Sequence, residues 1–566
     1  MRVQAVSFQI PKIGYLNKFT GTVNPIKTVE LPYDTVSFKG RDEKLLSRED
    51  GLEAANKLRT STSGYRAPYG EKFNDKFVYS LTQALAQDMQ KNGQTTTLVG
   101  GDTRQATKKY APEIVDTFNS QGINVLVPHL SDAKKGEISP VASPILALTT
   151  REYEIPLSVL LTASHNPWED GGYNFLTSEG AVADDARVRP LTDNLEEITK
   201  NGKTKPKTTD YVGKKIYIDP YNIYKDYLDE KQFVDFEKIK DAGIDIFYED
   251  FGGTGGYYFP KLMEDYGIKI KKALSSKTDG PNPIERNMKN LAREVKSSNN
   301  PLKIGLANDG DSDRFGVIDE NGNFVSVTDV LTLCAYHLIK NKGMTSGTII
   351  KNDATSNKLD AMAKYFNDQG YDIDIEQTPV GFKFLGGKML ELENSEKPAI
   401  IAGEESGGLT IRGHIPEKDG FLALSILLDL VATENKPLGE ILSEINEKID
   451  GDYHSNCVNM KFKTEEAKEN ALKHFEKYFE GDIRNIAGID IDYEKTYEVD
   501  DHLREYKPGG DGLKFYLEDG SSVFVRKSGT EPVLRLYIDA ISEESEELLE
   551  NFLVDKVLGM GGQIKA

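Results

Sequence analysis

Ser164 follows a short apolar run, at the point where a strand of an α/β protein would end. The segment LLTASHNPWEDGG spans residues 160 to 172 and places Thr162, Ser164, His165 and Pro167 directly after the apolar residues. Ligands of α/β sheets bind outside the carboxyl ends of strands, so Ser164 is predicted to be exposed to a ligand there. An ordinary turn is the alternative, because Asn-Pro and Asp-Gly are turn formers.

Three aspartates alternate in the segment GLANDGDSDRFGVIDENG: Asp309, Asp311 and Asp313. Carboxylates at this spacing can point oxygens at one hard divalent cation such as Mg²⁺ or Ca²⁺. The segment nearly matches an EF-hand loop, but Arg314 stands where that loop needs glycine, and the flanking residues are typical of strands. We therefore predict a metal loop between two strands. A solvated acidic turn without metal is the alternative.

A segment rich in glycine carries carboxylate and hydroxyl groups. IIAGEESGGLTIRGHIPEKDG contains Glu404, Glu405, Ser406, His414 and Lys418. Carboxylates and hydroxyls suit sugar hydroxyls, although a flexible loop would explain the glycines equally well.

The segment FVRKSGTEPVLRLY places cationic and hydroxyl groups around Gly529, namely Arg526, Lys527, Ser528, Thr530 and Arg535. Guanidinium groups, hydroxyls and backbone N–H groups around a glycine turn can form a phosphate cradle. A charged hairpin is the alternative.

Repeated strand-then-helix patterns must position these loops. Residues 95–118, 214–230 and 347–366 each read as an apolar strand, a turn and a segment of helical period, which indicates α/β units with parallel sheets. From about Ser455, strand-like and helical segments alternate as in a smaller α+β domain. We predict three similar α/β domains with mixed or parallel sheets at residues 1–210, 211–322 and 323–448, and a C-terminal α+β domain at 449–566. Residues 201–215 and 437–452 are predicted to connect domains.

Composition limits the classes of partner. At 566 residues the chain is too long to fold around a single hydrophobic core. Its formal net charge of −21 argues against nucleic acid or an anionic membrane as a partner. We find no apolar run long enough to span a bilayer and no signal core, so we expect a cytoplasmic protein. Cys334 and Cys457 form no CxxC pair, so we predict two buried thiols rather than a disulfide or zinc site.

Together these segments resemble the α-D-phosphohexomutase superfamily. Its members carry T-A-S-H-N-P, D-G-D-x-D-R, G-E-x-S and R-x-S-G-T-E-P loops, one on each of four domains, and all four motifs occur here. TSGYR at residues 62 to 66 and TPVGFKFLGG at residues 378 to 387 are further matches. The resemblance covers nearly the whole chain.

The resemblance implies a role for each matched residue. Ser164 would carry a phosphoryl group, one oxygen of which would complete a Mg²⁺ site formed by Asp309, Asp311 and Asp313. Arg66 and Arg314 would hold the phosphoryl groups near the metal. Further residues of the matched segments would bind the substrate: His165, Thr378, Lys383, Glu404, Ser406, His414, Lys418, Arg526, Ser528, Gly529, Thr530 and Arg535.

Two positions depart from the family pattern. Asn174 in GGYNF stands where relatives carry a lysine often assigned to acid–base work, and asparagine cannot shuttle a proton. Gly408 stands where short-loop relatives carry the histidine of G-E-x-S-G-H. His414, Lys383 or Lys418 could substitute, and the sequence does not choose among them.

The resemblance implies a phosphohexomutase that works through a phosphoserine and a bisphosphorylated sugar. The long loop ending in His-Ile-x-Glu-Lys-Asp-Gly is more similar to glucose-preferring phosphoglucomutases, so we expect interconversion of glucose 1-phosphate and glucose 6-phosphate, with glucose 1,6-bisphosphate as intermediate and activator. A phosphomannomutase, a dual-specificity enzyme and a catalytically impaired sugar-phosphate-binding protein are the alternatives. The partner is a small hexose phosphate, and a monomer and a homodimer both stay open.

Overall fold

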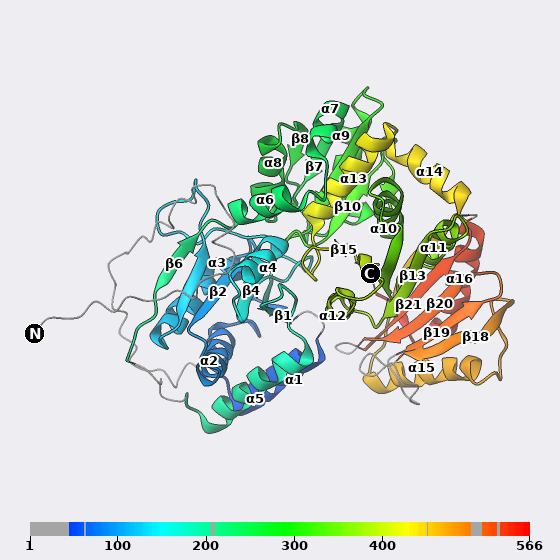
Figure 1. Ribbon diagram of the computed structural model, residues 1–566. Coiled ribbons are helices and arrows are strands. Elements are labelled where there is room, and N and C mark those ends of the chain that lie inside the picture. The colour runs from blue at the N-terminus through cyan, green and yellow to red at the C-terminus, as the bar shows by residue number, and fades with distance from the viewer. Residues whose placement is uncertain are drawn as a thin grey trace, which may run out of the picture.

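Four β-sheets follow one another along the chain, and each forms the centre of one domain (Figure 1). The computed structural model describes residues 45–61, 64–204, 210–449, 451–499, 512–528 and 532–565. Domains 1 to 3 combine mixed sheets with helices, and the C-terminal domain 4 is an antiparallel sheet with two helices. This confirms the predicted fold class of three α/β domains and a C-terminal α+β domain.

Domain 1 is built on a six-stranded sheet of order β1-β5-β4-β2-β3-β6. The strands β2, β3, β4 and β6 pair in parallel, while β5 runs antiparallel to β1 and β4. The bounds are β1 Tyr65–Pro68, β2 Thr96–Gly101, β3 Asn124–Pro128, β4 Leu157–Leu161, β5 Asp170–Thr177 and β6 Lys215–Ile218, with helices α1 Arg48–Thr60, α2 Asp75–Lys91, α3 Gln105–Ser120, α4 Ser143–Glu152 and α5 Asp185–Asn201. The strand β6 thus joins the first sheet although it follows residue 210.

The central strand β4, with the sequence LSVLL, is buried on both faces, as expected for a strand covered on both sides. Leu157, Val159 and Leu161 enter one hydrophobic core of domain 1, whereas Leu160 enters a second core that continues into domains 2 and 3. This double burial fixes the end of β4, where the serine loop begins.

Domain 2 has a five-stranded sheet of order β11-β10-β9-β7-β8. Its elements are α6 Pro220–Lys231, α7 Phe236–Ala242, β7 Asp245–Glu249, α8 Gly255–Asp265, β8 Ile270–Leu274, η2 Glu285–Asn287, α9 Lys289–Lys296, β9 Lys303–Asn308, β10 Phe315–Ile318 and β11 Phe324–Val325. The strands β9 and β10 are neighbours and pair antiparallel, so the aspartate segment between them forms a tight connection at the end of these two strands.

Domain 3 has a four-stranded sheet of order β13-β12-β14-β15. Its elements are α10 Val327–Tyr336, η3 His337–Asn341, β12 Ser346–Asn352, α11 Lys358–Asn367, β13 Asp372–Thr378, α12 Phe382–Leu392, β14 Ala399–Glu404, β15 Gly408–Ile411, α13 Gly420–Glu434 and α14 Leu438–Lys448. The prediction that residues 437–452 are a connection was largely wrong, because Leu438, Ile441 and Ile445 form the buried side of α14.

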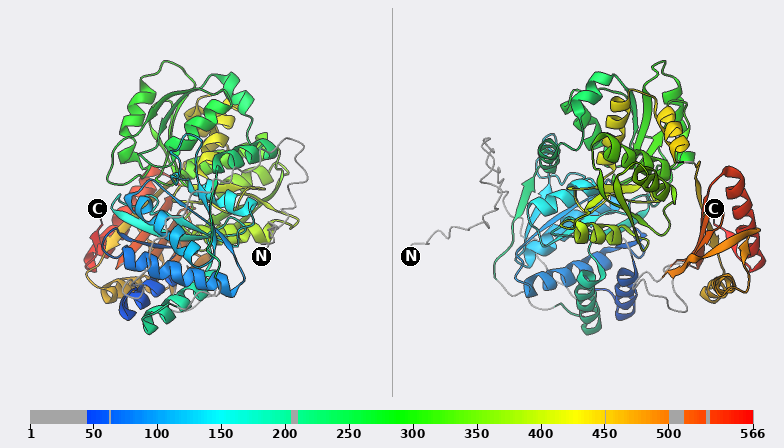
Figure 2. Two further views of the ribbon diagram at one scale, coloured as in Figure 1. Left: turned by 90° about the vertical axis from the view of Figure 1, so that its left-hand side faces the viewer. Right: turned by 45° about the vertical axis from the view of Figure 1, so that its right-hand side comes forward.

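Domain 4 has a seven-stranded sheet of order β17-β18-β19-β20-β21-β16-β22 and its own hydrophobic core. Its elements are β16 His454–Lys461, α15 Glu465–Phe479, β17 Asn485–Ile486, β18 Ile489–Val499, β19 Gly512–Leu517, β20 Ser522–Lys527, β21 Val533–Ala540, α16 Glu543–Gly559 and β22 Gln563–Ile564. Figure 2 shows it at one side of the molecule, next to domain 3.

Polar contacts join domain 4 to domain 3. The Asn357 backbone N–H donates to Asp539 Oδ2 at 2.8 Å, and Lys514 Nζ donates to the Asp353 carbonyl oxygen at 3.0 Å. Both Lys514 and Asp539 are buried. The contact between these two domains therefore depends on buried charges as well as on the small apolar cluster around Phe524.

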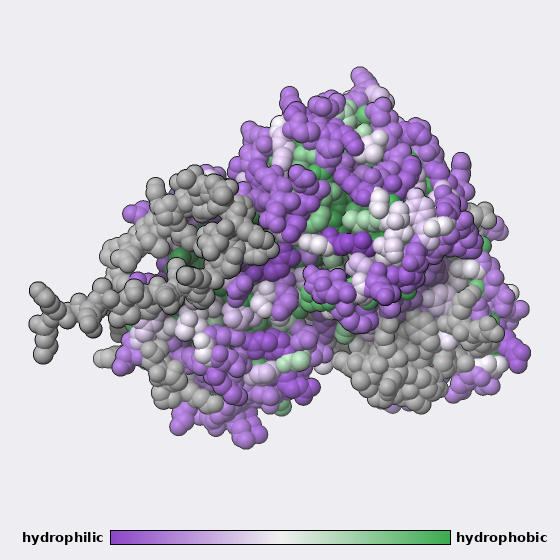
Figure 3. Space-filling view, viewed as in Figure 1, coloured by the Kyte–Doolittle hydropathy of each residue, from purple (hydrophilic) through white to green (hydrophobic). Residues whose placement is uncertain are grey.

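One face of the molecule is mostly polar, and the two cysteines differ in burial. Hydrophilic residues cover most of the face shown in Figure 3. Among the described residues, no helix combines the length and apolar character needed to cross a membrane. Cys334 is a buried thiol as predicted, but Cys457 is exposed, because it lies on the strand β16 near the sheet edge.

Candidate active site

The Ser164 side chain lies where domains 1 and 2 meet. It follows β4 in a left-handed backbone conformation, with φ of 52°, which is uncommon for a residue with a side chain. Its hydroxyl donates to Asp309 Oδ2 at 2.7 Å and lies 3.3 Å from His165 Nδ1. The prediction that Ser164 is exposed was wrong for this conformation. It is 0% exposed, because the Asp309 loop packs directly against it.

The three aspartates form one buried cluster. One carboxylate oxygen from each of Asp309, Asp311 and Asp313 lies within 4.8 Å of the others. Burial, followed by the neighbouring carboxylates, raises the pKa of Asp309 well above its ordinary value and also raises the pKa of Asp311. Oδ1 of Asp311 and Oδ1 of Asp313 are buried and accept no hydrogen bond from any described residue. Clustered carboxylate oxygens that accept no hydrogen bond fit the ligand set of a hard divalent cation.

Cations surround this cluster. Lys418 Nζ lies 2.8 Å from Asp313 Oδ2, and Arg314 Nε lies 3.8 Å from Asp313 Oδ1. Burial alone would raise the pKa of Asp313, but Lys418 and Arg314 outweigh it and lower that pKa. The pKa of Arg66 is lowered by burial and by the nearby Arg314. Two guanidinium groups and an ammonium group therefore converge on the end of the serine loop.

His165 is held neutral by these cations. Arg314, burial and Arg66, in that order, lower its pKa well below the ordinary value. Because its Nδ1 faces the Ser164 hydroxyl, a neutral imidazole can exchange a hydrogen bond with it. Arg66 reaches the same loop, where Nη1 lies 3.4 Å from Asn166 Oδ1.

The sugar-loop residues lie at the end of β14. Ser406 Oγ donates to Glu404 Oε1 at 2.5 Å; Glu404 ends β14, and Ser406 lies in the turn that leads into β15. The neighbouring Glu405 accepts a hydrogen bond from Asn352 Nδ2 at 2.8 Å. The carboxylate of Glu404 is one of the charges that raise the pKa of Arg314. The sugar loop therefore lies beside the metal loop.

The structure separates the three candidates for the missing proton carrier. The His414 side chain is fully buried, with Nε2 at 2.9 Å from Asp419 Oδ2, so it cannot contact a ligand in this conformation. Lys383 Nζ pairs with Asp185 Oδ1 at 2.9 Å and joins domain 3 to α5. Lys418 alone of the three contacts the aspartate cluster. Thr378 is buried at the end of β13, and its hydroxyl donates to the Pro379 carbonyl oxygen at 3.1 Å.

The phosphate-cradle residues lie on adjacent strands of domain 4. Arg526 on β20 and Arg535 on β21 are direct cross-strand partners. Like charges placed opposite each other destabilise a sheet, so an anion between them would relieve the repulsion. Ser528 is buried at the end of β20. Gly529 and Thr530 lie outside the described residues.

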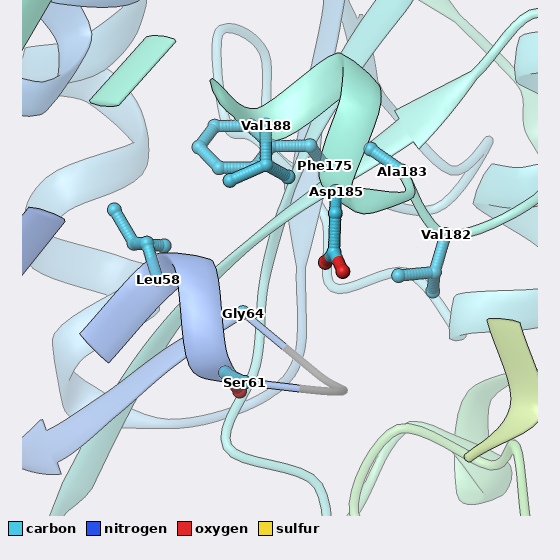
Figure 4. A pocket seen from close by; sticks show the side chains of 8 residues that line it. All are labelled: Leu58, Ser61, Gly64, Phe175, Val182, Ala183, Asp185 and Val188. Atoms are coloured by element: carbon cyan, nitrogen blue, oxygen red, sulfur yellow. The ribbon is translucent and has the colours of Figure 1, made fainter. Parts of the chain in front are cut away.

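Asn174 lies inside domain 1, behind the serine loop. Its Nδ2 donates to the Thr162 carbonyl oxygen at 3.3 Å, and a side chain at Gly64 would collide with its Oδ1. Figure 4 shows a small pocket next to Gly64, between α1, β5 and the start of α5. Leu58, Phe175 and Val188 make its lining mostly apolar, so we do not assign it to the site.

Sequence reasoning missed Ser143. This residue begins α4, and its hydroxyl donates to Asp311 Oδ2 at 2.7 Å while its backbone N–H donates to the Asp311 carbonyl oxygen at 2.8 Å. Ser143 thus ties domain 1 to the aspartate loop. A helix start at Ser-Pro was the available signal, but it does not say which loop the serine meets.

Family comparisons agree with this geometry. Models of phosphoglucomutase/phosphomannomutase domains match in order: α/β/α domain I at residues 57–202, domain II at 223–322, domain III at 328–449 and the C-terminal domain at 460–556. The chain therefore belongs to the phosphoglucomutase/phosphomannomutase family of the α-D-phosphohexomutase superfamily, as its sequence motifs predicted. It is an enzyme of the phosphohexomutase class.

Individual relatives carry several substrate names. The phosphoglucomutase/phosphomannomutase of Thermococcus kodakarensis is 26% identical over 501 residues, which cover 86% of this chain and 96% of the relative. A phosphoglucosamine mutase of Ruminiclostridium cellulolyticum is 27% identical over 516 residues, covering 86% and 97%. The open form of parafusin, a phosphoglucomutase of Paramecium, has the same fold, with a TM-score of 0.69, 21% identity and coverage of 89% and 94%.

Proposed function

We propose that this chain is a phosphoglucomutase that interconverts glucose 1-phosphate and glucose 6-phosphate through phosphorylated Ser164. The observation that carries the proposal is the Ser164 hydroxyl at 2.7 Å from Asp309, within a cluster of three buried carboxylates. Phosphoryl transfer asks a protein mainly for alignment and charge neutralisation, and this arrangement supplies both.

Asp309, Asp311 and Asp313 would hold a Mg²⁺ ion, with one phosphoryl oxygen on Ser164 as a further ligand. When bound, the ion would withdraw charge from the transferring phosphoryl group. Arg66 and Arg314 would bind the same phosphoryl group by charge-assisted hydrogen bonds, which are stronger than neutral ones.

The hexose would lie between domains 1 and 2 on one side and domains 3 and 4 on the other. Glu404 and Ser406 would bind sugar hydroxyls, while Arg526, Arg535 and Ser528 would bind the phosphate that does not react. Phosphoserine gives its phosphoryl group to the free hydroxyl of the sugar, and the resulting glucose 1,6-bisphosphate returns its other phosphoryl group to Ser164. The domains must exclude water while the bisphosphate turns around, because hydrolysis would end the cycle.

Lys418 is the cation that we propose at the site from which the family lysine is missing at Asn174. Burial lowers its pKa, but the charges of Asp313, Glu404 and Glu417 outweigh burial and raise it. Lys418 would therefore stay protonated and would bind charge rather than carry a proton. Its aliphatic chain passes over Gly408: an added Cβ there would lie 2.2 Å from Lys418 Cδ. The glycine at the position of the short-loop histidine therefore leaves space for a lysine that arrives from the end of the same loop. Lys418 would bind the anionic groups at the aspartate cluster.

We also expect a cytoplasmic location.

A coupled assay tests the proposal. It follows glucose 6-phosphate formation from glucose 1-phosphate with Mg²⁺ and a trace of glucose 1,6-bisphosphate, for wild type, Ser164→Ala and Ser178→Ala, a half-buried control outside the site. Activity in wild type and Ser178→Ala that is lost in Ser164→Ala supports the proposal. Faster turnover of mannose 1-phosphate would replace it with a phosphomannomutase, and comparable rates would indicate a dual-specificity enzyme. Wild type inert on glucose, mannose and glucosamine phosphates would favour a sugar-phosphate-binding protein.

A further inference from the structure

Arg104 is a buried arginine outside every motif named above, and it uses all of its side-chain donors. It follows β2 at the start of α3 and is only 1% exposed. Its Nε donates to Asp102 Oδ2 at 3.0 Å. The other four N–H groups reach backbone carbonyls of the serine loop, and this is the feature that sets Arg104 apart.

The four loop acceptors surround the reactive serine. Nη2 donates to the carbonyl oxygens of Ser164 at 2.6 Å and of Asn166 at 2.7 Å. Nη1 donates to the carbonyl oxygens of Asp170, at 3.2 Å, and of Pro167. A planar guanidinium has five donors in a fixed geometry, so one side chain here determines the path of a seven-residue loop.

Asp102 holds the backbone of Ser164 on its N–H side. Its Oδ2 accepts a hydrogen bond from Thr162 Oγ1 at 2.8 Å, and that same hydroxyl oxygen accepts the Ser164 N–H at 2.8 Å. The N–H of Ser164 is thus bound through Thr162 and Asp102, and its carbonyl oxygen is bound by Arg104. Both peptide groups of the serine connect to one buried ion pair.

This double anchoring explains how Ser164 keeps its left-handed conformation. A residue with a side chain pays on the order of 1–2 kcal/mol for such a backbone, and it persists only where the surroundings over-determine it. The parallel pairing of β2 with β4 brings the two loops together, because both follow the carboxyl ends of these adjacent strands.

We infer that Arg104 is a positioning residue for the phosphoryl-transfer reaction: with Asp102, it fixes the Ser164 backbone so that the hydroxyl points at Asp309. This inference rests on the proposed function. A misplacement of about 1 Å at a reacting atom can reduce a rate on the order of a hundredfold. Arg104→Lys keeps the charge opposite Asp102 but cannot reach four carbonyl oxygens, so it isolates the positioning role.

The test compares Arg104→Lys with Arg187→Lys. Arg187 forms an ion pair with the buried Asp88, at 2.8 Å, in the same domain, and among the described residues its side chain makes no hydrogen bond or ion pair with the serine loop. We expect Arg104→Lys to lower kcat about a hundredfold with KM changed less than about threefold, because the groups proposed for the sugar hydroxyls and for the phosphate that does not react lie on domains 3 and 4. Arg187→Lys should keep kcat. Equal kcat for both lysine variants, or a fall in kcat that matches the loss of folded protein, would overturn the inference.

Two further readouts keep the outcomes separate. Trp168, the single tryptophan of the chain, has its ring 5.2 Å from the Arg104 guanidinium, so its emission should shift to the red in Arg104→Lys and not in Arg187→Lys. This readout stands even if wild type has no mutase activity, an outcome that would refute only the proposed function. If Arg104→Lys does not fold, Thr162→Val and Thr162→Ser decide: serine must retain kcat and valine must lose it, and equal rates would overturn the inference.

Discussion

Gly408→Ala is expected to disable the site through a single methyl group. The new Cβ would lie 2.2 Å from Cδ and 2.5 Å from Cγ of Lys418. These atoms are in the middle of the lysine chain, so the whole side chain must take another path. Lys418 Nζ would then leave its position at 2.8 Å from Asp313 Oδ2.

The size of the effect follows from this ion pair. Removing one partner of a buried pair costs about 3–5 kcal/mol. Lys418 and Asp313 each keep about a tenth of their side chains exposed, and Arg314 still lies 3.8 Å from Asp313. We therefore expect a loss of about 2 kcal/mol in the free energy of unfolding, and a fall in kcat/KM of about thirtyfold if the same contact stabilises the transition state.

A double-mutant cycle tests the cause. Thermal unfolding and the coupled mutase assay are run for Gly408→Ala, Lys418→Ala and the double variant, with Gly559→Ala as a control, because an added methyl at Gly559 meets no atom within 4 Å. In the Lys418→Ala background the contacts with Cδ and Cγ are gone and only the one with Cβ, at 3.3 Å, remains, so Gly408→Ala should have a much smaller effect there. An equal loss of stability and activity in both backgrounds would show that Gly408→Ala does not act by displacing Lys418.

Three further predictions concern metal, pH and packing. Mg²⁺ at a hundred times its Kd should stabilise wild type by about 2.7 kcal/mol, and Asp309→Asn should remove that response in a thermal-shift titration; an unchanged response would place the metal elsewhere. Burial and the neighbouring Lys351 lower the pKa of Lys514 from 10.5 to about 8, so the folded protein binds fewer protons than the unfolded chain between these values. Stability relative to Lys514→Met should therefore rise between about pH 8 and pH 10, and a flat difference in unfolding midpoint would contradict this. Gly172→Ala should destabilise domain 1 by at least about 2 kcal/mol in urea unfolding, because its Cβ would lie 1.8 Å from the Thr162 carbonyl oxygen; a midpoint equal to wild type would show that the strands can separate.

The sequence predicted the fold class because that depends on local patterns, whereas the convergence of the loops was implied by the family resemblance. Apolar strands followed by helices are readable at residues 95–118 and 347–366, and both are observed as β2 with α3 and β12 with α11. The motifs around Ser164 and Asp309 lie 145 positions apart, and a hydrogen bond joins the two residues in the structure. The resemblance implied that both belong to one metal site, and that role stays a prediction.

What the sequence could not predict depends on three-dimensional packing. The burial of Ser164 arises because a loop of another domain covers it. His414 looked like a ligand contact, but Asp419, five residues later, holds it inside domain 3. Arg104 carries no motif signal toward Ser164. Only the pairing of β2 with β4 brings it under a serine 60 residues away.

Isotope labelling can detect the proposed phosphoryl group on Ser164. The enzyme is incubated with ³²P-labelled glucose 1,6-bisphosphate and Mg²⁺, digested, and the labelled peptide is sequenced. A chase with unlabelled glucose 1-phosphate follows in a second sample. We expect label on Ser164 alone, its absence from Ser164→Ala, and its transfer to sugar during the chase within the time of turnover. Active enzyme without label at Ser164, or label that glucose 1-phosphate does not remove, would contradict the account.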